Sequence, residues 1–139
     1  MDKKLLCDFE SELKTKPQIT KLDDSELDII QKNINTEFKI DLNRTWCWES
    51  LGDDHQVMNY GEEDGLEKIK GLLKKNLDIK IVVTDEDVPP WFGFKGSLVE
   101  LLDVIRELRY FEFFIIDETF TWIIFDTHHN SLVYAGLKS

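Results

Sequence analysis

The chain has 139 residues, of which 42% are hydrophobic and 12% aromatic, and its formal net charge is −11. An aromatic content this high argues against disorder, and the length suits one domain with a sizeable core, so we expect a single domain over residues 1–139. The strong negative charge disfavours binding to nucleic-acid backbones and to anionic membranes, because both are themselves negative. It favours solubility and attraction to basic partners.

The sequence carries no targeting signal that we recognise. Residues 1–8 contain no apolar stretch of signal-peptide length, and no segment approaches the roughly 18 apolar residues of a membrane helix. The two cysteines, Cys7 and Cys47, lack the paired spacing of a disulfide framework or a zinc site, and we interpret both as reduced thiols. We therefore expect a cytoplasmic protein.

Two helices are expected in the first third of the chain. The first covers residues 3–14 and is closed by Pro17. The second covers residues 25–38, after Asp23 and Asp24, which can cap it. In both helices the apolar residues recur at helical spacing. They are Leu5, Leu6, Phe9 and Leu13 in the first, and Leu27, Ile30, Ile34 and Phe38 in the second.

The middle of the chain is less clearly patterned. Residues 40–51 leave two alternatives open: a strand that presents Trp46 and Trp48 on one face, or a short helix. The two tryptophans could stack a ligand, although paired tryptophans in small domains are more often core anchors. Residues 57–60 are typical of a short strand. Three acids at 62–64 precede an apolar helical pattern and suit a helix N-terminus.

The next part of the chain predicts a strand, a loop and a helix. The strand covers residues 79–84. Residues 85–94 contain two prolines and a glycine and are expected to be irregular. Ser97 and Glu100 have the spacing of a capping box, so a helix should begin there and end near Tyr110.

The last stretch, residues 111–136, has three runs rich in aromatic and β-branched residues, separated by short polar breaks. This pattern predicts a three-strand antiparallel meander. A right-handed crossover from the strand at 79–84 into the first of these runs would make that pair parallel. The predicted fold is therefore α+β, with a mixed, mainly antiparallel sheet that ends in the meander and three or four helices packed on it.

The polar break around His128 and His129 is the most chemical-looking cluster. Imidazole and carboxylate groups bind divalent metals, so these residues and Asp126 could form a site. The alternative is a hairpin turn in which Asp126 or Asn130 bonds to the backbone. We favour the turn, because adjacent strand residues point to opposite faces. No cofactor is expected, and a metal-binding protein or metal-dependent enzyme is the alternative function.

A pair of carboxylates for acid–base catalysis could be sought between Asp117, Glu118 and Asp126. Consecutive turns of an antiparallel meander lie at opposite ends of the sheet, about 17 Å apart for strands of ordinary length. We therefore expect no active site built from both turns.

Residues 85–87 are all acidic, and three aromatic residues follow them at 91, 92 and 94. This combination is typical of a partner-binding loop, because acids steer a basic partner and aromatic rings supply contact area. The alternative is that Trp91, Phe92 and Phe94 fold back onto the core, which is the commoner fate of aromatic rings. The predicted partner-binding residues are Asp85, Glu86, Asp87 and Trp91, with Asp53 and Asp54 as outlying members.

Scattered residues of the C-terminal half carry a family resemblance. They are Val82–Asp85, Trp91, Gly96–Ser97, Glu112–Asp117, Trp122–Ile124, His128–Asn130 and Gly136. Together they resemble a family of small uncharacterised bacterial proteins, and such acidic domains are similar to immunity proteins encoded beside polymorphic toxins. The resemblance implies a bacterial, cytoplasmic protein without enzymatic activity, and it assigns no site. The first 60 residues add nothing to it.

The leading prediction is thus a binding protein, most concretely an immunity protein that sequesters a toxin domain. Toxins that attack nucleic acids tend to be basic. An acidic inhibitor can occupy their phosphate-binding surface.

Overall fold

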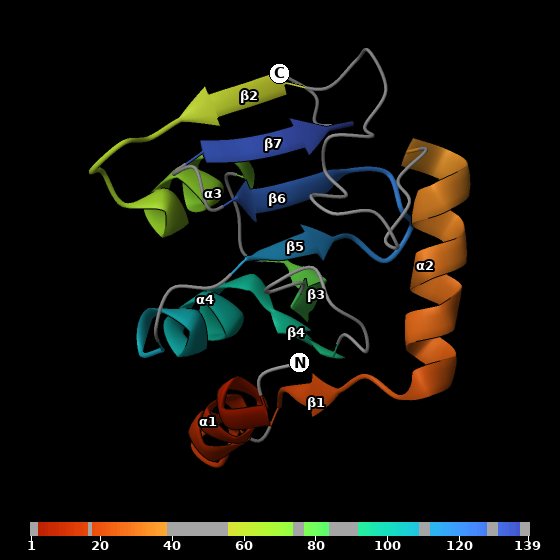
Figure 1. Ribbon diagram of the computed structural model, residues 1–139, viewed down its shortest axis with the longest axis vertical. Coiled ribbons are helices and arrows are strands. Elements are labelled where there is room, and N and C mark those ends of the chain that lie inside the picture. The colour runs from red at the N-terminus through yellow and green to blue at the C-terminus, as the bar shows by residue number, and fades with distance from the viewer. Residues whose placement is uncertain are drawn as a thin grey trace.

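The structure, a computed structural model, describes residues 3–16, 18–38, 56–73, 77–83, 92–108, 112–127 and 131–136. Over these residues the fold is α+β, with four helices and seven strands (Figure 1). None of these helices is long and apolar enough to span a membrane. The elements are α1 (Lys3–Leu13), β1 (Thr20–Lys21), α2 (Asp24–Phe38), β2 (Gln56–Asn59), α3 (Gly65–Leu73), β3 (Asp78–Val83), β4 (Phe92–Ser97), α4 (Leu98–Arg106), β5 (Phe113–Ile116), β6 (Ile123–Thr127) and β7 (Ser131–Ala135).

The seven strands form one sheet in the order β1-β4-β3-β5-β6-β7-β2, and every pair of neighbours is antiparallel. Strands β5, β6 and β7 are consecutive neighbours, which confirms the predicted meander. The helices expected at 3–14 and 25–38, the helix expected after the acids at 62–64 and the strand expected at 57–60 are also present. The expectations for residues 40–51 lie outside the described residues.

The parallel pair expected between β3 and β5 is wrong, because these strands are antiparallel. The reason is strand β4. Its residues were expected to form the end of an irregular segment, at 85–94, and a helix cap, at Ser97, but they form a strand. β4 pairs along the whole of β3, and the crossover through α4 therefore joins β4 to β5. Both of these strands run antiparallel to β3, which lies between them, so the crossover connects two parallel strands that are not neighbours.

Glycine in β4 serves close packing and does not break the strand. A Cβ atom on Gly93 would lie 2.5 Å from the carbonyl oxygen of Ile81 and 2.9 Å from a methyl group of Leu22. Only glycine allows this approach. On either side of Gly93, Phe92 and Phe94 are buried, and Phe94 stacks on Phe9 with ring centroids 4.4 Å apart. The expected alternative that these rings cover the core is confirmed for Phe92 and Phe94.

Helices cover both faces of the sheet. Figure 1 shows α1, α3 and α4 on one side and α2 on the other. Successive residues of a strand point to opposite faces, so Ile115 joins the core beneath α1, α3 and α4, while Phe114 and Ile116 join the core beneath α2. This explains why the meander strands are apolar at successive positions.

The helix ends follow the local capping signals. Asp23 accepts a hydrogen bond from the backbone N–H of Glu26, whose carboxylate accepts one in return from the N–H of Asp23. Ser97 accepts from the N–H of Glu100, as predicted. Helix α4 ends at Arg106 and not near Tyr110, because the N–H groups of Glu107 and Leu108 turn back to carbonyls three residues earlier.

Candidate functional site

One end of the sheet brings together residues from strands that are distant in sequence. Through the strand pairs, Val83 lies opposite Phe113, Phe113 opposite Asp126, and Asp126 opposite Leu132. We call this the Asp126 end. The turn at 117–122 lies at the other end, where Ile116 is opposite Ile123. The predicted separation of the two turns is therefore confirmed for their described flanks.

Asp126 is a buried carboxyl group within β6, with 5% of its surface exposed. Its Oδ1 accepts a hydrogen bond from the hydroxyl of Tyr60 at 2.6 Å, across 66 residues of sequence. Burial raises the pKa of Asp126 from 3.8 to about 7, the bond from Tyr60 lowers this pKa, and the nearby charge of Glu112 raises it. A carboxyl group of this kind changes its charge near neutral pH.

Tyr60 and Glu112 complete this buried polar cluster. Tyr60 follows β2 and is 8% exposed, and its ring lies against Gly65, where a Cβ atom would come within 2.8 Å of it. Glu112 precedes β5 and is 7% exposed. Tyr60 directly follows β2 and packs against Gly65, the first residue of α3. Its hydrogen bond to Asp126 therefore links the end of β2 and the start of α3 to strand β6.

This geometry corrects the role expected for Asp126. Asp126 was expected in a turn or a metal site, but it lies in strand β6 and its hydrogen bond is to Tyr60. His128 and His129 lie outside the described residues. Within the described ranges no three histidine, cysteine, aspartate or glutamate residues form a cluster that could hold a metal ion.

Asp117 stabilises the turn between β5 and β6. Its Oδ1 accepts from the backbone N–H of Thr121 at 2.7 Å and of Trp122 at 3.3 Å, and its Oδ2 accepts from the hydroxyl of Thr119. An acid–base pair with Asp126 is excluded by their positions at opposite ends of the meander.

All six predicted partner-binding residues lie outside the described residues: Asp85, Glu86, Asp87, Trp91, Asp53 and Asp54. Their described neighbours can be placed. Val83 and Phe92, which flank the first group, pair with each other at the Asp126 end. Gln56, which follows the second group, begins β2 at the end of the sheet where Ile123 and Ala135 pair. The described residues next to the two groups therefore lie at opposite ends of the sheet.

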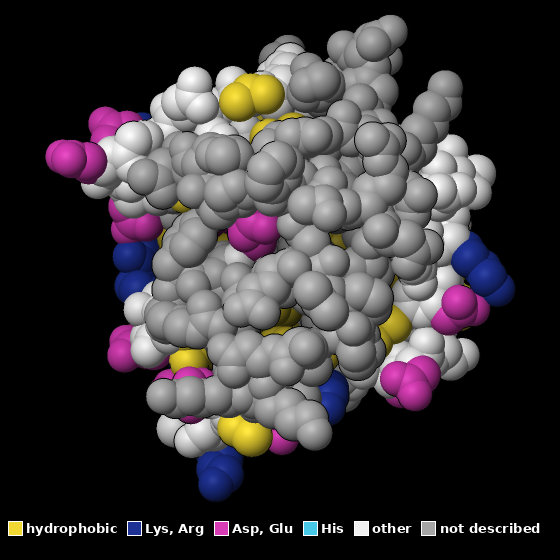
Figure 2. All heavy atoms as spheres, viewed as in Figure 1, with side chains coloured by type: hydrophobic (Ala, Val, Ile, Leu, Met, Phe, Trp, Pro, Cys, Tyr) yellow, Lys and Arg dark blue, Asp and Glu magenta, His cyan; other side chains and the backbone are white. Residues whose placement is uncertain are grey.

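An open groove of about 660 Å³ lies between β2 and α3. Met58 and Leu72 supply its apolar lining, and Glu63, Asp64 and Glu67 give it an acidic side. Lys68 pairs with Glu63 at 3.1 Å, so part of this charge is balanced locally. In Figure 2, acidic side chains also follow the outer rim of the face, over α3 and α4 on one side and over α2 on the other.

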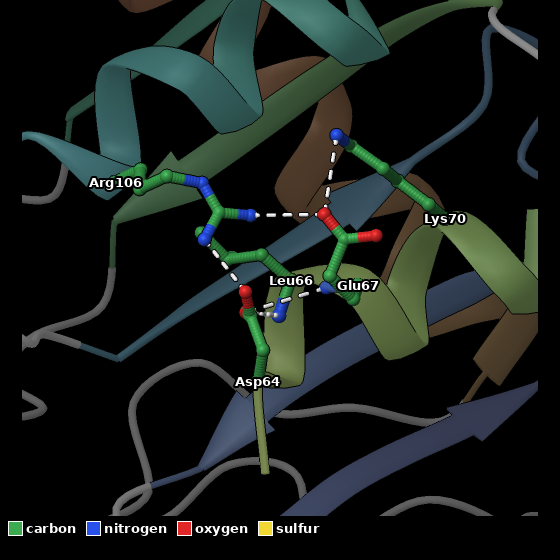
Figure 3. A network of polar contacts seen from close by, with 5 residues as sticks. All are labelled: Asp64, Leu66, Glu67, Lys70 and Arg106. Carbon is green, nitrogen blue, oxygen red and sulfur yellow. Dashed lines mark hydrogen bonds and ion pairs between the residues drawn. The ribbon is translucent and has the colours of Figure 1, made fainter.

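A charged network beside this groove joins α3 to α4 (Figure 3). Arg106, at the end of α4, contacts Asp64 Oδ2 at 2.6 Å and Glu67 Oε1 at 3.3 Å, and Lys70 contacts the same oxygen of Glu67 at 3.5 Å. Asp64 also caps α3, because its Oδ1 accepts from the backbone N–H of Leu66 at 2.9 Å. The Arg106 guanidinium holds the pKa of Asp64 below its usual value.

Replacing Asp64 should separate its two roles. Asp64→Ala removes the cap and the ion pair, and we expect a loss of about 1–2 kcal/mol in the free energy of unfolding. Asp64→Asn keeps a capping oxygen and loses only the charge, so the loss should stay below about 1 kcal/mol and shrink at high salt. Denaturant melts at two salt concentrations measure both. Equal losses for the two variants would mean that the cap contributes nothing.

With this geometry described, the chain can be compared with known proteins. A family of unknown function, DUF6756, matches residues 10–139. The chain belongs to this family. The DUF6756 match begins at residue 10, so the expectation that the first 60 residues add nothing to the family pattern is wrong. No curated protein and no solved structure matches the chain.

The DUF6756 region includes the cluster of Asp126, Tyr60 and Glu112 and the groove beside α3. Sequence reasoning missed Tyr60 as the partner of Asp126, because nothing local links residues 66 positions apart. It also missed Glu112, which comes near Asp126 only through the pairing of β5 with β6. The available signal was weak: an acid directly before one all-apolar run, at Glu112, and another directly after the next, at Asp126.

Proposed function

We propose that this member of the DUF6756 family is a binding protein for a basic protein partner, most concretely an immunity protein that neutralises a toxin domain. The observation that carries the proposal is the groove between β2 and α3, with an apolar lining beside an acidic side, in a chain of net charge −11. An apolar contact surface together with a charged surround is the usual anatomy of a specific interface.

The groove and the net charge contribute to binding in different ways. Near the groove, the acids Glu63, Asp64 and Glu67 are largely balanced by lysine and arginine partners, so the groove chiefly offers contact area. The net charge of the whole chain acts at longer range, where it speeds the approach of a basic partner and repels an acidic one.

The acidic loop at residues 85–87 is expected to contribute to this steering. It follows Val83, at the Asp126 end of the sheet, and Asn59, the last residue of β2, lies at the same end, opposite Ser131. A partner seated on the groove would therefore lie at the same end of the sheet as the described residues that flank this loop.

Association kinetics test this proposal. If the proposal holds, a gene for a basic toxin domain lies beside this one, and replacing Asp85, Glu86 and Asp87 with Asn, Gln and Asn should slow association with its product by roughly tenfold at low salt and flatten the salt dependence of the on-rate. Trp91→Ala should instead raise the off-rate by roughly tenfold, if its ring anchors the interface. Stopped-flow measurements at two salt concentrations separate these effects.

A control matched in charge is the replacement of Asp24, Asp28 and Glu37 by Asn, Asn and Gln on α2, which packs on the opposite face of the sheet from α3. This control should slow association far less than the loop variant. If the loop variant and Trp91→Ala both bind with unchanged rates, the loop has no part in the interface.

A further inference from the structure

Strand β2 forms one edge of the sheet, and no strand among the described residues pairs with its outer side. In any strand, alternate residues direct their backbone N–H and C=O groups to the two sides. The outer groups of an edge strand can therefore pair with a strand from another chain.

The two edges of this sheet differ in how they resist such pairing. Proteins usually protect an edge by keeping it very short or by placing lysine or proline on it. β1 has two residues, one of them Lys21, which pairs with Glu10 at 3.2 Å. β2 has four residues, Gln56–Asn59, without charge or proline, and its Val57 is 54% exposed.

We propose that β2 receives an extended segment of the basic partner as an eighth strand of the sheet. This inference rests on the proposed function and adds the binding mode to it. Strand addition draws its affinity from main-chain hydrogen bonds and its specificity from the side chains at alternate positions.

The faces of β2 indicate which side chains the added strand should carry. Val57 lies opposite Val133, on the side of the sheet covered by α2, and its exposed surface suits an apolar side chain. Met58 lies opposite Leu132, on the other side, and lines the groove. Beyond the end of β2, Glu62 and Glu63 are exposed, so a basic residue is favoured at that end of the added strand.

A second copy of this chain is the competing occupant, because β2 could pair with itself about a two-fold axis. Charge opposes this arrangement, since two chains of net charge −11 would be brought together. The same charge favours a basic segment.

The test uses the full chain and a synthetic peptide as the probe. The peptide alternates valine and threonine over seven residues and has lysine at both ends. The control peptide has the same sequence, with the backbone nitrogens of the seven valine and threonine residues methylated. Methylation leaves the charge unchanged and removes the N–H groups that the peptide needs to pair as a strand. Titrations followed by amide chemical shifts, together with hydrogen exchange of the β2 amides, report binding and its location.

We expect the unmodified peptide to shift the β2 resonances and to slow exchange of the outward β2 amides by roughly tenfold or more. The methylated peptide should do neither. Val57→Lys should weaken binding of the unmodified peptide by roughly tenfold, because it places a like charge on the edge. Ile29→Lys changes an equally exposed apolar residue, 52% exposed, and should leave binding nearly unchanged, since Ile29 lies on α2 and not on the edge strand.

Three results would overturn strand addition. Equal binding of both peptides would mean that the acidic surface binds basic segments without strand pairing, which leaves the proposed function in place. Absence of any β2 shift at millimolar peptide would mean that this edge does not accept a strand. Concentration-dependent β2 shifts without peptide would assign the edge to a second copy of the chain.

Discussion

Replacing Asp126 with Asn should remove a fall in stability that the wild-type protein shows between about pH 5 and pH 7.5. The folded-state pKa of Asp126 is raised from 3.8 to about 7, so the folded protein holds a proton that the unfolded chain has lost. Stability therefore decreases as pH rises from 3.8 to about 7 and is constant above that. The difference between these two pKa values corresponds to about 4 kcal/mol, as an upper value for a fully buried group.

The comparison of variants isolates this group from others that titrate. Every other titratable group, the three histidines included, is common to both proteins, so the comparison reports Asp126 alone. Lys95 lowers the pKa of Glu26, and Arg106 lowers the pKa of Asp64. The stability that these two carboxylates contribute is therefore lost only at acidic pH, as the pH falls through their lowered pKa values. At pH 5 the two proteins should have similar stability, because an amide oxygen can also accept the bond from Tyr60.

At pH 8 the Asp126→Asn variant should be the more stable protein, by up to about 3 kcal/mol, which is the part of the loss that falls between pH 5 and pH 8. Tyr60→Phe should shift the fall to higher pH, because it removes the hydrogen bond that lowers the pKa of Asp126. Glu112→Gln should shift it to lower pH. Denaturant melts at several pH values measure all four proteins. Parallel pH profiles for wild type and Asp126→Asn would show that the pKa of Asp126 is the same in the folded and the unfolded protein, which contradicts a raised pKa.

Ile115→Ala and Ile124→Ala should each lower the free energy of unfolding by about 2–5 kcal/mol. Both side chains are fully buried and lie opposite each other on β5 and β6, beneath the helices of one face. Each substitution removes buried methyl groups and leaves a cavity that the surrounding sheet cannot close. Because the two residues are in one cross-strand pair, the double variant should deviate from the sum of the single losses.

Ile29→Ala is the matched control for these two substitutions, since Ile29 is an isoleucine that is 52% exposed on α2. Its loss should stay within about 0.5 kcal/mol. Denaturant melts measure the three variants. A loss well below 1 kcal/mol for Ile115→Ala would contradict the assignment of the meander to the core.

Local signals account for the parts of the fold that the sequence predicted. The meander was predictable because each of its strands pairs with the next one along the chain, across a short polar break. The capping box at Ser97 and Glu100 was predictable because it requires only residues three positions apart.

Features that depend on distant residues were not predictable. Phe92, Gly93 and Phe94 form a strand because Gly93 fits against Ile81 and Leu22, and the phenylalanines pack with Phe9. The sequence shows only a glycine between aromatic residues, which is equally typical of a loop. The partnership of Asp126 with Tyr60 likewise requires that β2 lie beside β7, which no local pattern predicts.

The proposed function requires a basic toxin domain as partner, and calorimetric titration of the protein with the product of any neighbouring gene for such a domain, at about 50 mM and about 500 mM salt, tests it most directly. We expect a stoichiometric complex at low salt whose affinity falls by roughly tenfold or more at high salt, because screening weakens attraction to an acidic surface. The absence of a complex at low salt, or an affinity that does not change with salt, would contradict recognition through the acidic surface.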